Sequence, residues 1–104
     1  MKNIAGMLQK AQALQAKMNE LQAELKTREI VGSSGQGKVK VTMNGSHEVI
    51  AIKIDPEVVK PEETDLLEDL VLAALNDARE KVTRMVEEEM NKVGGGLGLP
   101  KGLF

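Results

Sequence analysis

The sequence contains no cysteine, tryptophan or tyrosine, and it has a single phenylalanine, Phe104, and a single histidine, His47. The lack of cysteine excludes disulfide bonds, thiolate catalysis and cysteine-based zinc sites. With almost no aromatic side chains, the core has to be built from Leu, Ile, Val, Met and Ala. The same scarcity gives little support to base stacking on single-stranded nucleic acid.

The chain also lacks a long hydrophobic run at its start. Gln9, Lys10 and Gln12 interrupt the apolar residues there, so we expect neither a signal peptide nor a membrane span, and we expect a cytoplasmic location. A length of 104 residues, 41% of them hydrophobic, is typical of one globular domain. A domain of this size buries only about two-thirds of its unfolded surface. Because so thin a core leaves apolar seams uncovered, we expect an obligate dimer.

The net charge of −2 conceals an uneven distribution. Residues 1–54 carry eight Lys or Arg against four Asp or Glu, whereas residues 55–69 carry one lysine against seven acids. The remaining residues balance five against five. A basic front half permits an anionic partner without requiring one.

Two amphipathic helices are predicted, over about residues 2–26 and 65–93. The first has a heptad pattern, with apolar residues at Ile4, Met7, Ala11, Leu14, Met18, Leu21 and Leu25. The second has an apolar stripe at Val71, Leu75, Ala78, Val82, Met85, Val86 and Val93. Gly94 is predicted to end it. Residues 1–93 should form one domain, and residues 94–104 a flexible glycine-rich tail.

Three short strands are predicted between the helices, over about residues 28–32, 37–43 and 46–54. The fold class is therefore α+β, with two layers in the order helix, three-stranded antiparallel meander, helix. Asn44-Gly45 indicates a two-residue type I′ turn, which would pair Val41 with Glu48 and Val39 with Ile50. One face of this hairpin should belong to the core: Val39, Val41, Met43, Ile50, Ile52 and Ile54. The other face is mildly basic and too sparsely charged to be the first choice for a binding site.

No group of residues predicts catalysis. The segment from Gly32 to Lys38 nearly matches a phosphate-binding loop, but Val39 stands where the hydroxyl residue belongs, and a strand follows instead of a helix. His47 has no converging partner, because strand alternation turns Glu48 to the opposite face. We therefore expect no enzyme activity, cofactor, metal or small-molecule substrate.

Lysines follow one flank of the first helix, at Lys2, Lys10 and Lys17, with Arg28 beyond them. Duplicated in a dimer, this stripe could contact DNA phosphates. The alternative is that these lysines only keep an amphipathic helix soluble. Nothing in the sequence matches a motif that enters a DNA groove.

Four segments resemble the YbaB/EbfC family of bacterial nucleoid-associated proteins. They are Gly6 to Met18, Gly37 to Gly45, Val49 to Glu57 and Leu67 to Ala78. The resemblance implies a homodimer with projecting helices that binds double-stranded DNA in the nucleoid with little or limited sequence specificity, without enzyme activity or a cofactor. The residues that could correspond to DNA contacts are Lys2, Lys10, Lys17, Arg79, Lys81 and Arg84. The alternative function is a non-enzymatic protein-interaction module with weak or incidental DNA binding.

Overall fold

The computed structural model describes residues 3–96, and side chains over residues 3–93. Helix α1 (Ile4–Thr27) leads into strands β1 (Glu29–Ser34), β2 (Val39–Asn44) and β3 (Val49–Ile54), and helix α2 (Thr64–Gly96) follows. Short 3-10 turns join β1 to β2 (Gly35–Gly37) and β3 to α2 (Pro56–Val58 and Pro61–Glu63). The sheet is antiparallel in the order β1-β2-β3. The predicted α+β class and element order are confirmed.

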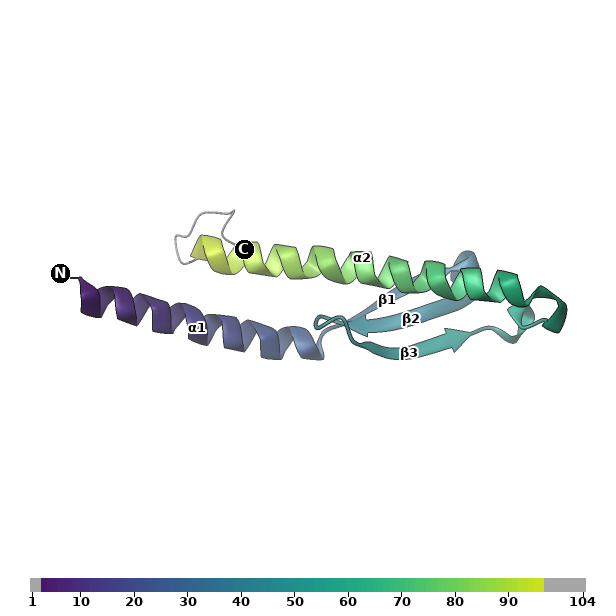
Figure 1. The fold of residues 1–104 in the computed structure, drawn as a ribbon, viewed down its shortest axis with the longest axis horizontal. Coiled ribbons are helices and arrows are strands. Elements are labelled where there is room, and N and C mark those ends of the chain that lie inside the picture. Colours follow the sequence, from purple (N-terminus) through teal and green to yellow (C-terminus); the bar gives the residue numbers. More distant parts are fainter. Residues whose placement is uncertain (1–2, 97–104) are drawn as a thin grey trace.

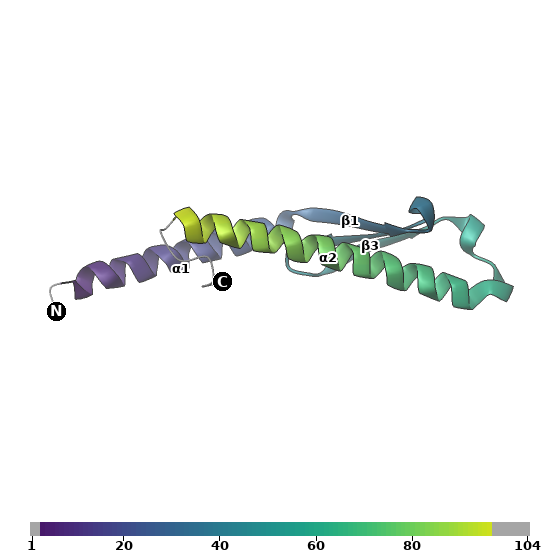
Figure 2. The same ribbon diagram turned by 90° about the horizontal axis from the view of Figure 1, so that it is seen from above.

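The molecule is long and thin. Its extents are 72 × 21 × 16 Å, and its radius of gyration is 19.5 Å, whereas a compact domain of 100 residues has about 13 Å. Figures 1 and 2 show the reason: α1 continues the long axis of the sheet, while α2 lies along the sheet and extends beside α1. A part of α1 therefore projects beyond the packed body.

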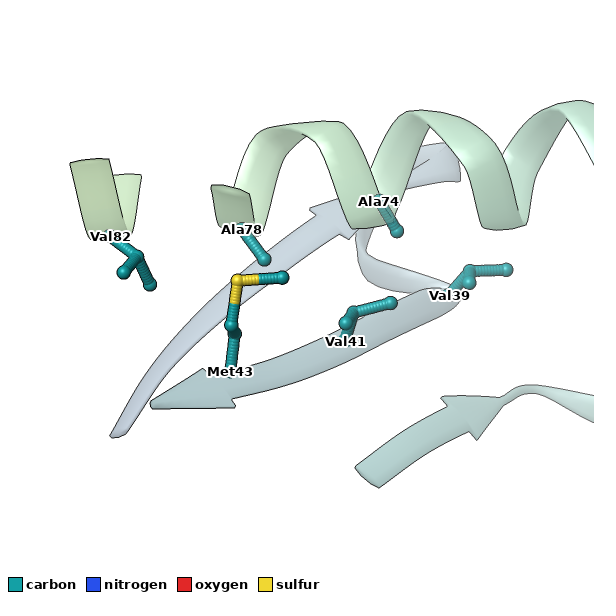
Figure 3. Packing of buried hydrophobic residues seen from close by; sticks show 6 residues of the cluster. All are labelled: Val39, Val41, Met43, Ala74, Ala78 and Val82. Carbon is teal, nitrogen blue, oxygen red and sulfur yellow. The ribbon is translucent and has the colours of Figure 1, made fainter. Parts of the chain in front are cut away.

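The core lies between α2 and the first two strands. Side chains of β2 alternate, so that Val39, Val41 and Met43 point toward α2 and are at most 3% exposed. They pack against Ala74, Ala78 and Val82 of α2 (Figure 3). The two alanines are small, and β1 has a glycine, Gly32, opposite them, so that the helix and the strand approach closely. A Cβ atom built on Gly32 would lie 2.2 Å from the backbone nitrogen of Ala78. Small residues thus seat the helix directly on β1.

Most of strand β3 lies outside this core, and only its last residue, Ile54, is partly buried against it. Helix α2 packs on β1 and β2, and β3 is the strand farthest from it in Figure 1. Ile50 and Ile52 are each 51% exposed, so their predicted burial is wrong. Ile52 does face Val41 across the ladder, but a single helix is too narrow to cover the third strand.

The predicted hairpin register is also wrong. Val41 pairs with Ile52 and Val39 with Ile54, with an irregularity after Thr42. The connection is longer than two residues because Asn44 builds the turn with its side chain. Its Oδ1 accepts hydrogen bonds from the backbone nitrogens of Ser46 (2.9 Å) and Glu48 (3.0 Å). The left-handed residue is His47, with φ of 62°, as in longer hairpin loops that end in such a residue.

Gly45 is needed because the end of α1 lies close to it, whereas its position after Asn44 in the sequence suggests a type I′ turn. A Cβ atom there would lie 2.5 Å from the carbonyl oxygen of Leu25. The Gly45 nitrogen donates hydrogen bonds to the carbonyl oxygens of Leu25 (2.8 Å) and Arg28 (3.1 Å). The hairpin turn therefore fastens the end of α1 to the sheet.

The apolar seam of α1 is buried only near this attachment. Leu21 and Leu25 are 6% and 3% exposed, whereas Ile4 and Met7 are 60% and 67% exposed. At the other end of the chain, α2 continues to Gly96, so the predicted stop at Gly94 is wrong. The remainder of the predicted tail, residues 97–104, lies outside the described residues.

Candidate nucleic-acid interface

The projecting part of α1 is basic. Lys10 and Lys17 are exposed on it, and no acidic residue precedes Glu20 in the sequence. Lys17 has a partner, since its Nζ lies 3.7 Å from Glu20 Oε2 with both side chains mostly exposed. Lys10 has no acidic residue within a turn on either side. Lys2, also predicted to contact DNA, lies outside the described residues.

Lys81 of α2 takes part in the packing of α2 on β1. Its Nζ lies 3.1 Å from Asp77 Oδ2 and 3.4 Å from the carbonyl oxygen of Val31. Asp77 Oδ2 in turn accepts a hydrogen bond of 2.9 Å from the backbone nitrogen of Ser33. The Ser33 N–H and then the Lys81 ammonium lower the pKa of Asp77 below its ordinary value. Lys81 is thus a structural link to β1.

Arg79 and Arg84 lie together on another part of the surface of α2 from Lys81. They line a shallow depression with Glu80, Thr83 and Glu87. The two acids balance the two arginines, so the surface here has mixed charge. The structure thus places the predicted basic residues that it describes in two groups, Lys10 and Lys17 on α1 and Arg79, Lys81 and Arg84 on α2, in different electrostatic surroundings.

An ionic cluster joins the base of α1 to α2. Arg28, at the end of α1, donates from a guanidinium nitrogen to Glu89 Oε1 at 2.9 Å, and Lys92 Nζ lies 3.3 Å from the same oxygen. These two cations, Arg28 first, lower the pKa of Glu89 below its ordinary value. Arg28 therefore holds the arm to the body, although its sequence position suggests that it belongs to the basic stripe of α1.

A cleft of about 380 Å³ lies between the two helices beside this cluster. Its lining combines both charges with apolar side chains: Lys17, Glu20, Leu21, Glu24, Glu89, Lys92 and Val93. Lys17 therefore lies on the side of α1 that faces α2. The balance of charges makes the cleft itself a poor site for a polyanion.

The sheet carries a basic pair that the predicted register concealed. Lys40 of β2 and Lys53 of β3 are directly opposite each other, and both are exposed on the face turned away from α2. The nearby Lys38 is occupied: its Nζ lies 2.8 Å from Glu57 Oε2, and this contact raises the pKa of Lys38. The predicted register overlooked the run from Asn44 to His47. These four residues all tolerate turn conformations, so they permit a loop longer than two residues.

No helix within residues 3–96 is long and apolar enough to cross a membrane. The fold and the exposed lysines define a class: an elongated α+β protein with a basic helical arm. The sequence matches the model of the YbaB/EbfC DNA-binding family over residues 1–97. The chain belongs to the YbaB/EbfC DNA-binding family.

Curated relatives agree with this assignment. A nucleoid-associated protein of Granulibacter bethesdensis is 52% identical over 103 residues, which cover 99% of this chain and 96% of that protein. A nucleoid-associated protein of Rhodospirillum rubrum is 50% identical with the same coverage. Among solved structures, an uncharacterized protein of Helicobacter pylori has a TM-score of 0.66 at 22% identity, covering 77% of this chain and 93% of that one. This last similarity concerns the fold.

Proposed function

We propose that the chain is a homodimeric nucleoid-associated protein that binds double-stranded DNA with little or limited sequence specificity. Lysines on α1 contact the phosphates, Lys10 foremost, with Lys2 beyond it; Lys17 contributes less, because it shares the mixed-charge cleft with Glu20. The observation that carries this proposal is a helical arm that projects from the body and has no acidic residue before Glu20. Phosphate contacts supply affinity without reading sequence.

The basic residues of α2 have a smaller part in this proposal. Arg79 and Arg84 share their surface with Glu80 and Glu87, which reduces the attraction for a polyanion. Lys81 is paired with Asp77 and also contacts the carbonyl oxygen of Val31, so its charge is partly neutralised within the fold. We therefore assign the larger share of the DNA contacts to α1.

Exposed apolar side chains on the body support the homodimer. Ile50 and Ile52 of β3 are half exposed, as is Leu72 of α2 at 57%. Strand β3 is also an edge strand, and an exposed apolar edge is a ready surface for a second chain. A second copy that covers β3 would leave the arms outside, where DNA can reach them.

Duplex binding measured against salt concentration tests the α1 assignment. If the dimer neutralises Z phosphates, log affinity should fall with log salt at a slope of about −0.9Z. Lys10→Glu keeps a good helix former at the position and should weaken binding to random-sequence duplex at every salt concentration. It should also make the slope shallower by about 1 for each phosphate that the variant no longer neutralises.

Lys60→Glu is the matched control, because it changes the net charge equally. Lys60 lies in the connector between β3 and α2, 3.9 Å from Glu63. It should weaken binding much less than Lys10→Glu does. Equal losses in the two variants would contradict contact through α1, and absence of salt-sensitive binding by the unchanged chain would contradict DNA binding altogether.

The exposed apolar residues at the start of α1 favour a second candidate function, a protein-interaction module with weak or incidental DNA binding. Ile4, Met7 and Leu8 form an apolar patch at helical spacing, each close to 60% exposed or more, which suits docking against another helix. Pull-down with and without nuclease separates the two functions. Partners that survive nuclease treatment, together with no duplex binding near physiological salt, would favour this candidate.

A further inference from the structure

The face of the sheet turned away from α2 has a row of cations at one end. Lys40 and Lys53 occupy directly opposed positions in the β2–β3 ladder, so their Cβ atoms are about 5 Å apart and their side chains share one face. Like charges in this arrangement destabilise a sheet. The row is therefore a local cost to the fold unless an anion offsets it.

The neighbouring charges leave this row positive. A shallow depression of about 320 Å³ is lined by Lys38, Lys40, Lys53 and Asp55. Lys38 is paired with Glu57 at 2.8 Å, and Asp55 Oδ1 accepts a hydrogen bond from the Glu57 backbone nitrogen at 2.9 Å. Within residues 3–96, Lys40 and Lys53 have no ion-pair partner.

The row is separate from the arm. Lys17 lines the cleft between α1 and α2, on the side of the molecule where α2 lies. Lys40 alternates with Val39 and Val41, which point toward α2, so its side chain points the opposite way. Lys40 is the second residue of β2, and β2 starts at the end of the sheet away from α1 (Figure 1). A duplex that meets both surfaces has to reach two sides of the molecule.

We propose that Lys40 and Lys53 form a second contact surface for DNA phosphates, on the open face of the sheet. This inference rests on the proposed function and adds a site to it. Two lysines within one row suit the closely spaced phosphates of a duplex backbone, and such contacts are independent of sequence. A dimer would present two such rows in addition to its arms.

Lys53→Glu tests the proposal sharply, because folding and binding should respond in opposite directions. Opposite charges across a ladder stabilise a sheet, so the variant should unfold at the same or a higher denaturant concentration than the unchanged chain. Its affinity for random-sequence duplex should fall about fivefold or more near 0.15 M salt, and the salt slope should become shallower, because fewer phosphates are neutralised.

The control is again Lys60→Glu, which makes the same change of net charge away from the sheet face. Greater loss of affinity in Lys53→Glu than in Lys60→Glu, with stability retained, supports the second surface. Equal loss in the two variants overturns it while leaving the α1 contacts intact. If the unchanged chain shows no salt-sensitive binding, the proposed function is overturned and this proposal with it, which is a different outcome from equal loss of affinity in the two variants.

Discussion

The projecting part of α1 and the body, which consists of the sheet and α2, differ in what limits their sequence, although both contain many apolar side chains. In the body, Val39 and Val41 are fully buried, and close packing determines which residues fit. On the arm, Ile4 and Leu8 are about 60% exposed, and charge and solubility determine what is tolerated. Stability thus resides in the body, whereas the proposed DNA contacts lie chiefly on the arm.

The same substitution in each region should show the largest contrast. Met43 is 3% exposed and packs on α2, whereas Met7 is 67% exposed. Met43→Ala should lower the free energy of unfolding by about 2–5 kcal/mol, since it removes buried contacts and leaves a cavity. Met7→Ala should change it by about 0.5 kcal/mol or less. Denaturant unfolding at one fixed protein concentration measures both, and similar losses would refute the contrast.

A second matched pair of variants tests which region forms the interface of the proposed dimer. Ile52 of the body and Ile4 of the arm are 51% and 60% exposed. Ile52→Lys should weaken dimer association by about 2 kcal/mol or more, because it buries a charge in the proposed interface. Ile4→Lys should leave association unchanged. Sedimentation equilibrium measures both, and dissociation by the arm variant alone would move the interface to α1.

The smallest effect is expected at the ionic cluster of Arg28, Glu89 and Lys92, which joins the two regions. Because Arg28 and Lys92 lower the folded-state pKa of Glu89, its contribution to stability is present above the ordinary glutamate pKa of about 4.3. It is lost as pH falls through the lower folded value. Glu89→Gln should therefore reduce stability slightly at pH 7 and not at low pH. Unfolding midpoints at pH 7 and pH 3 test this, and an equal difference at both would contradict it.

Much of the fold could be predicted from local pattern. The order of elements and the buried residues of β2 follow from alternation and helical spacing, and those predictions are confirmed. The pattern could not reveal that α2 covers two strands and leaves Ile50 and Ile52 exposed, because their spacing equals that of Val39 and Val41. Coverage depends on where the helix lies, which nothing local in the strand encodes.

The candidate site shows the same division. Exposure of Lys10 and Lys17 was predictable from the heptad pattern, because both lie beside the apolar seam. The ion pair of Lys81 with Asp77 follows from helical spacing, but the contact of Lys81 with the Val31 carbonyl oxygen was not predictable, since it depends on how close α2 lies to β1. The opposition of Lys40 and Lys53 was missed because it follows from the hydrogen bonds of the Asn44 side chain, which lengthen the turn and shift the register.

The fastening of α1 only at its last turns makes the helix a lever. Residues 4–20 extend about 25 Å beyond the buried Leu21, at 1.5 Å of rise per residue. A rotation of about 10° at the base, where Gly45 and Arg28 hold the helix, would displace the tip by about 4 Å. In the proposed dimer, small adjustments at the contact between Arg28 and Glu89 would change the distance between the two arms, and with it the width of the duplex that fits between them.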